Sequence, residues 1–290
     1  MATVLQGERP DSERRFRWPV ARHGMLMAGA ALLVAVALVS IFAPFIATHD
    51  PQAMNPIERL RAPTLAHFFG TDSYGRDVFS RAVYGGRVSL TVGLGVATLS
   101  TVFGVAIGVC SGFYRRADAV IMRITDGIMS IPAILLAIAL VTINQPGTLT
   151  LIVAITVPEV PRVVRLVRSV VLTIREQTYV EAAIAVGTPP LRLLVRHVLP
   201  NALAPIIVQA TFICAVAIII EASLSFLGIG TPPEVPSWGN LIAGGRNFIR
   251  NAPWIIIYPG AMLGLTVLSI NLLGDGLRDM LDPRFARTLR

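Results

Sequence analysis

Long apolar runs without a charged residue alternate along the chain with short polar segments rich in arginine. No charged residue lies within the apolar runs at residues 25–47, 88–114, 198–220 and 251–274. A helix needs about 20 apolar residues to cross a hydrocarbon core about 30 Å thick, so each run predicts a transmembrane helix. The pattern therefore predicts an all-α integral membrane protein.

Two further spans are less uniform. One runs from about residue 119 to 143 and has Arg123 and Asp126 near its start. The other begins near Thr148, but Glu159 and Arg162 follow after only a short apolar stretch. With these two the count reaches six transmembrane helices, and the limits of the fourth stay open.

The first run divides the N-terminal part of the chain. Residues 25–47 exceed the apolar core of a cleaved signal peptide, so we expect an uncleaved first span. Residues 1–24 then form a polar tail and residues 48–86 a polar segment on the far side. In this segment Val78, Phe79, Ala82 and Val83 fall on one helical face, and the polar side chains of Arg76, Asp77, Ser80 and Arg81 lie opposite. This pattern predicts an amphipathic helix in the membrane interface or a solvated loop helix packed on the bundle.

Small residues and turn formers predict how the spans meet. Gly104, Gly108 and Gly112 recur every fourth residue, which lets a neighbouring helix approach closely. Residues 144–147, Asn-Gln-Pro-Gly, predict a tight turn. Arg162, Arg165 and Arg168 recur every third residue and could share one stripe whose side chains reach toward an interface.

A polar hairpin interrupts the apolar pattern at residues 181–201, EAAIAVGTPPLRLLVRHVLPN. Gly187 and the pair Pro189–Pro190 split it into two short helical halves, and Thr188 could cap the second half. Further on, residues 228–254 are rich in glycine and proline, which predicts a re-entrant or surface loop. Trp238 and Trp254 flank that loop and suggest an aromatic belt at the interface.

The amino-acid composition argues against several classes of function. The 290 residues are 54% hydrophobic and only 14% charged, against about 25% charged in soluble domains. The net charge of +8 is spread between apolar runs rather than on one basic face, which argues against nucleic-acid binding. All 25 basic residues are arginine, and a P-loop needs a lysine, so this chain should not hydrolyse ATP by itself. His23, His49, His67 and His197 have no partner at metal-ligand spacing, so no metal site is expected.

The arginines also predict the orientation. With both termini in the cytoplasm, 18 arginines lie in inner segments and 7 in outer ones. Cytoplasmic segments of membrane proteins carry the excess of basic residues. The hairpin at 181–201 is therefore expected on the cytoplasmic side.

The hairpin resembles the EAA loop of ABC importer permeases. It carries Glu181-Ala182-Ala183, Gly187 four residues later, and Leu199-Pro200, while His197 replaces the isoleucine of the general consensus. Three more stretches are similar to the dipeptide, oligopeptide and nickel branch, and specifically to its C-type permease: GTDSYGRDVFSR at 70–81, EASLSFLGIGTPPEVPSWG at 221–239 and NLLGDGLRDMLDPR at 271–284.

This resemblance implies a type I importer permease in a bacterial plasma membrane, with a five-helix core over residues 87–275 and a cytoplasmic tail over 276–290. The partners would be a homologous second permease, one or two ABC ATPase subunits that bind ATP and Mg²⁺, and an extracytoplasmic substrate-binding protein. The chain itself would hold no cofactor. The loop at 181–200 would couple it to the ATPase through Glu181, Ala182, Ala183, Gly187, Leu199 and Pro200.

Three polar residues at membrane depth stay open between two roles. Asp126, Glu221 and Asn271 could line the translocation path or could tie helices together. Short peptides are the expected cargo, with a nickel- or haem-type importer as the alternative. The rival classes are a stand-alone secondary transporter, which would show two similar halves, and a membrane-embedded enzyme, which would need a cluster of reactive side chains.

Overall fold

The computed structural model describes residues 18–145 and 147–281. The described chain is helical apart from loops, and its one extended pairing is an isolated bridge between Thr71 and Asp77. The all-α prediction is therefore confirmed. Residues 1–17, 146 and 282–290 lie outside the described residues. The described parts of the tails predicted at 1–24 and 276–290 are helical, since α1 begins at Trp18 and α11 continues to Leu281.

The helices follow the apolar pattern closely. In chain order they are α1 (Trp18–Ile41), α2 (Ala43–Ile46), α3 (Val78–Phe113), α4 (Arg115–Met129), α5 (Ala133–Ile143), α6 (Thr148–Arg175), α7 (Thr178–Ala185), α8 (Pro190–Leu193), α9 (Leu199–Phe226), α10 (Trp238–Gly245) and α11 (Trp254–Leu281). Short 3₁₀ turns lie at Pro56–Glu58 and Arg246–Phe248, and a π-helical turn at Leu194–Val198 joins α8 to α9.

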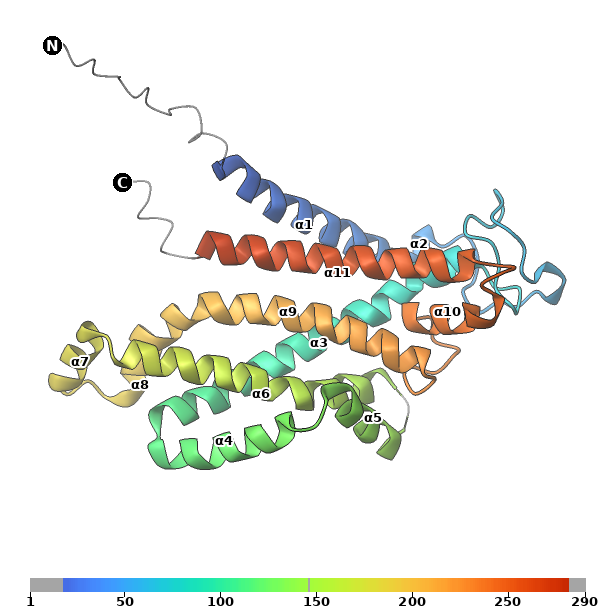
Figure 1. Ribbon diagram of the computed structural model, residues 1–290. Helices are drawn as coiled ribbons and strands as arrows, with labels where there is room; N and C mark the ends of the chain where they lie inside the picture. Colours follow the sequence, from blue (N-terminus) through green and yellow to red (C-terminus); the bar gives the residue numbers. More distant parts are fainter. Residues whose placement is uncertain (1–17, 146, 282–290) are drawn as a thin grey trace, which may run out of the picture.

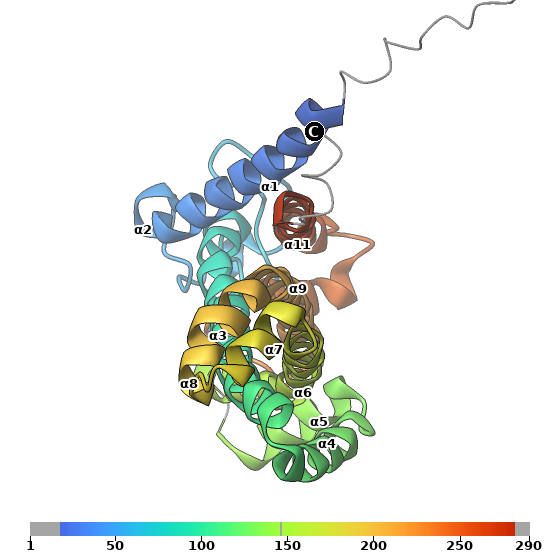
Figure 2. The same ribbon diagram turned by 90° about the vertical axis from the view of Figure 1, so that its left-hand side faces the viewer.

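The long helices form one elongated bundle, and different short helices and loops lie at its two ends (Figure 1). Viewed end-on, α1 and α11 lie on one flank, α4 and α5 on the other, and α3, α6 and α9 between them (Figure 2). The hairpin of α7 and α8 lies at the end where α1 begins and α11 ends, whereas α10 and the segment between α2 and α3 lie at the opposite end (Figure 1).

Within the described residues, four helical segments are long and apolar enough to cross a membrane: Gly24–Ile41, Val78–Phe113, Leu191–Phe226 and Trp254–Leu281. A fifth candidate is the pair α4 and α5, but the pair is bent by 87°. The span predicted from about residue 119 to 143 is therefore present as two helices with a bend between them. Pro132 explains the bend, because a proline disfavours helical geometry in the residue before it.

The fourth predicted span, whose limits the sequence left open, corresponds to α6. It is 28 residues long and contains Pro158 and Pro161. It carries more charged residues than any of the four apolar spans: Glu159, Arg162, Arg165, Arg168 and Arg175. Its place between α3, α4 and α9 nevertheless puts it inside the bundle (Figure 2).

The predicted interfacial helix around residue 80 is wrong, because these residues form the first turns of α3. Asp77 caps the helix by accepting a hydrogen bond from the Ser80 amide at 2.7 Å. Arg81, expected on a solvent-facing side, is 2% exposed and donates to the carbonyls of Pro51 and Pro233 at 3.0 and 3.2 Å. Loop carbonyls thus cover the polar face that would otherwise have met the interface.

The glycine pattern predicted close packing, and α3 packs directly against α6. A Cβ at Gly108 would lie 2.8 Å from the Val167 Cβ, and one at Gly112 would lie 2.5 Å from the Val171 Cγ1. Gly104 meets Val163 in the same way, so the two parallel helices keep a four-residue register. Small residues that let helices approach are the usual source of attraction between helices inside a membrane.

The loop at 228–254 folds into α10 and packs inward. Trp238 is fully buried, and its indole N–H donates to the Ala82 carbonyl at 2.9 Å. The Trp254 indole donates to the Thr71 carbonyl at 3.2 Å. The proposed aromatic belt is therefore wrong for Trp238, which is buried, whereas Trp254 is partly exposed and its place in such a belt stays a prediction.

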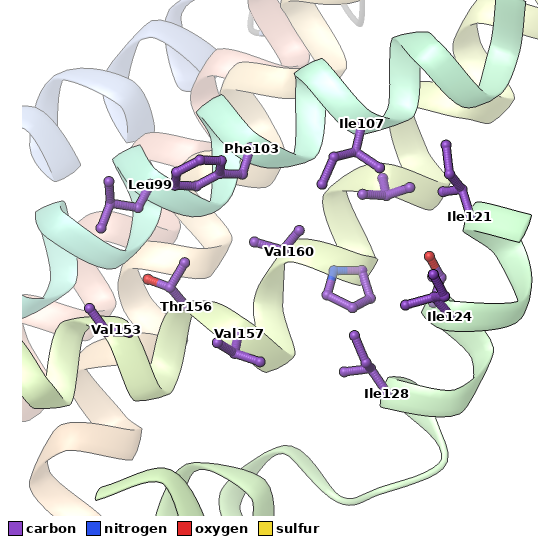
Figure 3. A pocket seen from close by; sticks show the side chains of 13 residues that line it. Leu99, Phe103, Ile107, Ile121, Ile124, Ile128, Val153, Thr156, Val157 and Val160 are labelled. Atoms are coloured by element: carbon purple, nitrogen blue, oxygen red, sulfur yellow. The ribbon is translucent and has the colours of Figure 1, made fainter. Parts of the chain in front are cut away.

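An apolar pocket of about 540 Å³ lies between α3, α4 and α6 (Figure 3). Leu99, Phe103 and Ile107 of α3 face it across from Ile124 of α4 and Val157 of α6 (Figure 3). Its two hydroxyl-bearing residues are Thr125 and Thr156, and Thr156 donates to the Ile152 carbonyl of its own helix. The pocket suits hydrocarbon rather than a charged cargo.

Candidate coupling hairpin

The first arm of the hairpin is α7, and its end is fixed by one glycine. Gly187 has φ +81°, a conformation that side chains with a Cβ rarely adopt. The Gly187 amide donates to the Ile184 carbonyl at 2.9 Å, and the Thr188 amide donates to the Ala183 carbonyl at 3.1 Å. These two bonds form a Schellman motif, which ends the helix and turns the chain back.

The second arm is α8 and the π-helical turn that follows it. The Leu193 amide donates to the Pro189 carbonyl at 3.0 Å, which closes the first turn after the proline pair. Asn201, at the start of α9, donates to the His197 carbonyl at 2.6 Å and to the Tyr179 hydroxyl at 3.4 Å. Because Tyr179 belongs to α7, this contact joins the two arms near their bases.

The hairpin is anchored on one side and open on the other. Val180, Leu193 and Val198 are at most 3% exposed and belong to the main hydrophobic core. The opposite side presents exposed apolar side chains: Tyr179, Ile184, Val186, Leu191 and Val195. An apolar surface rimmed by polar residues is typical of a protein–protein contact site.

The residues of the expected coupling motif lie on this element. Glu181 and Ala182 are exposed in α7, and Ala183 is half-buried against the core. Glu181 is in the first turn of α7, where the helix dipole favours a negative charge. Leu199 and Pro200 begin α9, so the motif spans the whole hairpin.

Polar contacts fasten α6, the helix that leads into the hairpin, to α3 and α4. Arg168 of α6 binds Asp118 of α4 through two nitrogens, at 2.5 and 2.7 Å. Ser111 of α3 donates to the same carboxylate at 2.5 Å. Arg175, at the end of α6, donates to the Gly112 carbonyl at 2.8 Å. Two-pronged arginine–carboxylate contacts fix geometry as well as distance, so α3, α4 and α6 are fastened together just before α7.

The arginine stripe therefore does more than reach toward an interface. Arg165 pairs with Asp126 at 2.6 Å and Arg162 lies 3.3 Å from Glu159, so all three stripe arginines contact carboxylates. Sequence reasoning missed Asp118 and Arg175 as partners. Asp118 lies in the first turn of α4, where the helix dipole favours a negative charge, but nothing local in the sequence indicates that its partner is Arg168 of α6.

The three polar candidates at membrane depth occupy different environments. Asp126 is exposed and joins α4 to α6 through Arg165. Glu221 is fully buried and accepts hydrogen bonds from Ser89 of α3 at 3.0 Å and Ser225 of α9 at 2.9 Å. Asn271 is exposed on α11. The structure brings none of the three into contact with another.

A further carboxylate, Glu159, is buried on α6. Its side chain is fully buried, and neither oxygen accepts a hydrogen bond from the described residues, although Arg162 is within ion-pair distance. The register of Gly104 with Val163 places Ser100 opposite Glu159, and the Ser100 hydroxyl also lacks a partner among the described residues. This polar position interrupts an otherwise apolar helix interface.

The histidines are less scattered than their spacing suggested. His49 and His67 stack with ring centroids 4.6 Å apart, at the bundle end opposite the hairpin. Asp77 lies beside His67. Chain folding thus brings together potential metal ligands that are 18 and 10 residues apart in sequence.

The arrangement is that of a multi-pass membrane protein with an exposed hairpin at one end of its bundle, and comparison with known proteins gives its family. Residues 100–287 match the family model described as "Binding-protein-dependent transport system inner membrane component". Residues 14–63 match the "N-terminal TM domain of oligopeptide transport permease C". The chain belongs to this family of ABC importer permeases, in the peptide branch, and acts as a permease subunit of such an importer. The stand-alone secondary transporter and the membrane-embedded enzyme are therefore set aside.

Full-length relatives agree with this assignment. A probable peptide ABC transporter permease protein of Sinorhizobium fredii is 51% identical to this chain, and the match covers 92% of this chain and 91% of the length of the relative. The dipeptide transport system permease protein DppC of Alkalihalophilus pseudofirmus is 43% identical over 91% of this chain and 87% of its own. The oligopeptide transport system permease protein OppC of Bacillus subtilis is 36% identical over 96% and 90%.

A solved structure shares the fold. A chain of the inward-facing MetNI methionine ABC transporter superposes with a TM-score of 0.59 at 20% identity, covering 72% of this chain and 96% of that one. The type I importer permease fold expected from the sequence is thereby confirmed.

Proposed function

We propose that this permease subunit forms half of a translocation pathway for short peptides and is driven by a separate ATPase that docks on the hairpin of α7 and α8. The observation that carries the proposal is the two-sided hairpin. Its inner side is fastened into the core through Val180, Leu193 and Val198, and its outer side exposes apolar residues at one end of the bundle.

The hairpin acts as a lever in this proposal. Glu181, Ala182 and Ala183 offer a carboxylate and small side chains to a groove on the ATPase, and Gly187 keeps the turn. When the ATPase subunits close on ATP, they move the hairpin, and the Arg168–Asp118 pair passes that movement to α3 and α4. Such rigid rocking of a helix group converts between inward- and outward-facing states.

ATP and Mg²⁺ belong to the partner in this mechanism. The chain has no lysine, and a phosphate-binding P-loop needs one, so the subunit supplies no ATPase site of its own. One fused ATPase chain or two separate ones would serve equally well.

We place the hairpin and both termini in the cytoplasm of a bacterium, with the bundle in its plasma membrane. The arginine excess supports this orientation. A substrate-binding protein then delivers cargo at the opposite end, where α10 and the segment between α2 and α3 lie.

Peptide cargo is supported by the names of the relatives, which are described as peptide, dipeptide and oligopeptide permeases. The pocket between α3, α4 and α6 is apolar and suits hydrocarbon better than charged peptide ends. We therefore propose a cargo cavity shared with a homologous second permease, to which Asp126, Glu221 and Asn271 are candidate contributors or helix ties.

Purification of this chain from its native membrane through a tag tests the assembly. We expect a second permease and ATPase subunits to be recovered with it, and ATP-driven peptide uptake after reconstitution of the complex. Uptake by the isolated chain, driven by an ion gradient without ATP, would contradict the proposal.

A further inference from the structure

The bundle end opposite the hairpin holds a cluster of ligand-type side chains that the transport mechanism does not use. His49 follows α2, His67 lies in the segment before α3, and Asp77 is the N-cap of α3. One ligand atom from each of the three lies within 4.8 Å of the others. His67 and Asp77 are buried and His49 is exposed, so the cluster is held from within and open on one side.

The two ring nitrogens of His67 both face carboxylates. Its Nδ1 is 2.9 Å from Asp77 Oδ1, and its Nε2 is 3.4 Å from Glu58 Oε2. A neutral imidazole has a single N–H and can donate to only one of them. The other nitrogen then points a lone pair at an anionic oxygen, a repulsion that a bound cation or a second proton on the ring would remove.

The surrounding groups favour a cation that His67 and Asp77 share. Glu58 already has partners in Asn55 at 2.9 Å and Arg61 at 3.2 Å, so it is held in place to accept the Nε2 proton. A carboxylate that takes the outer proton of a metal-bound histidine is the usual support for such a ligand. The other Asp77 oxygen is held by the Ser80 amide, which leaves Oδ1 for the ion.

We propose that His49, His67 Nδ1 and Asp77 Oδ1 bind one divalent transition-metal ion, with Glu58 orienting His67. Two imidazoles and one carboxylate match the ligand sets of Zn²⁺, Co²⁺ and Ni²⁺, whereas Ca²⁺ and Mg²⁺ prefer oxygen alone. Bonds of about 2.0 Å require ligand atoms roughly 3.3 Å apart in a tetrahedron, so His49, the exposed member, moves inward on binding. Water completes the coordination on the open side.

The ion would tie three parts of the chain together. His49 comes just after the first span, His67 comes from the loop, and Asp77 opens α3. One link already exists, because the His49 amide donates to the Ser80 hydroxyl at 3.1 Å. A metal at this place would stabilise the outer end of the permease where it meets its surroundings.

Metal binding to the full-length chain in its complex tests the proposal. The complex is purified through a tag without histidine, stripped with a chelator and titrated with Zn²⁺ or Co²⁺ in the absence of nucleotide. We expect one additional Zn²⁺ per complex relative to the His49→Ala variant, and visible absorption bands from Co²⁺ bound to histidine that Zn²⁺ displaces. His49→Ala should weaken the affinity of this site by at least about tenfold.

Two further variants sharpen the result. Glu58→Gln keeps the size of the side chain and should weaken Zn²⁺ binding by about 10- to 100-fold through loss of the orienting carboxylate. His197→Ala, at the hairpin end, is the matched control and should leave binding unchanged. Equal Zn²⁺ binding by the wild type and His49→Ala, including no measurable binding by either, would overturn the proposal, provided that both elute as the intact complex. Peptide uptake is not part of the readout, so the outcome is independent of the coupling mechanism.

Discussion

Replacing Gly187 with valine is expected to uncouple transport while the subunit still assembles. Gly187 has φ +81°, and a Cβ built there meets no atom within 4 Å. The substitution therefore causes no collision, and its whole cost is backbone strain. A residue with a Cβ loses about 1–2 kcal/mol in this conformation, and a branched one loses more.

That strain is large for a turn closed by two hydrogen bonds. A loss of about 1–2 kcal/mol lowers the ratio of the native turn to its alternatives by roughly 5- to 30-fold. If only the native turn fits the ATPase, uptake should fall, and by up to that factor when the native turn and its alternatives lie close in free energy. The buried anchors Val180, Leu193 and Val198 are untouched, so the amount of subunit in the membrane should not change.

Uptake of a labelled dipeptide into proteoliposomes with ATP and binding protein measures this effect. Gly187→Asn is the matched control, because asparagine tolerates the left-handed conformation and should keep most of the activity. Gly24→Val is a second control, since its Cβ would also meet open space but on an ordinary helical backbone. Undiminished uptake by Gly187→Val would refute the lever, and equal losses in the valine and asparagine variants would refute the strain argument.

Three further substitutions test the connections of the hairpin and the bundle. Gly108→Leu should push α3 from Val167 of α6, cost about 1–3 kcal/mol and lower the melting temperature of the complex, whereas Gly264→Leu, which enters open space, should not. Arg168→Ala and Asp118→Ala should each impair coupled ATP hydrolysis. Because both substitutions remove the same ion pair, the double variant should lose much less activity than the sum of the two single losses. Additive losses would argue against the pair. If Glu221 ties α3 to α9, Glu221→Gln should retain peptide uptake, because an amide can still form hydrogen bonds with Ser89 and Ser225. Glu221→Leu should abolish uptake, because it leaves both hydroxyls without that partner. Loss of uptake in Glu221→Gln would instead indicate that the pathway needs a charge at this position.

Local patterns in the sequence predicted the helices and the hairpin well. Apolar length is enough to locate α1, α3, α9 and α11, because a membrane span needs a long uninterrupted run. Gly187 and the following prolines predicted the split of the hairpin, since both residue types restrict the backbone locally. The four-residue glycine spacing likewise predicted the close contact of α3 with another helix, though not that the partner is α6.

Features that depend on contacts between distant segments were not predicted. The face of Arg81 looked solvent-exposed until the carbonyls of Pro51 and Pro233 folded over it. Trp238 looked interfacial because its partner, the Ala82 carbonyl, lies 156 residues away in sequence. The cluster of His49, His67 and Asp77 was missed for the same reason, since its spacing matches no local ligand motif.

The bend between α4 and α5 was not predicted either, although its cause is local in the sequence. Pro132 was visible in the sequence, but the apolar residues on both sides read as one continuous run. Hydropathy counts residues and carries no direction, so it cannot separate a straight span from one bent by 87°. The restriction that a proline places on the backbone of the preceding residue was the signal for this bend.

Cross-linking from the hairpin to the ATPase tests the central claim most directly. Cysteine replaces the exposed Ala182 of α7 in a chain whose Cys110 and Cys214 have been substituted, and the assembled complex is treated with a short thiol cross-linker reactive toward cysteines placed along the ATPase groove. Ile57, exposed at the opposite end of the bundle, is the control position. We predict a permease–ATPase product from Ala182→Cys whose yield changes with ATP, and none from Ile57→Cys. No product from Ala182→Cys in an intact complex, or equal yields from both positions, would contradict the assignment of the hairpin as the coupling element.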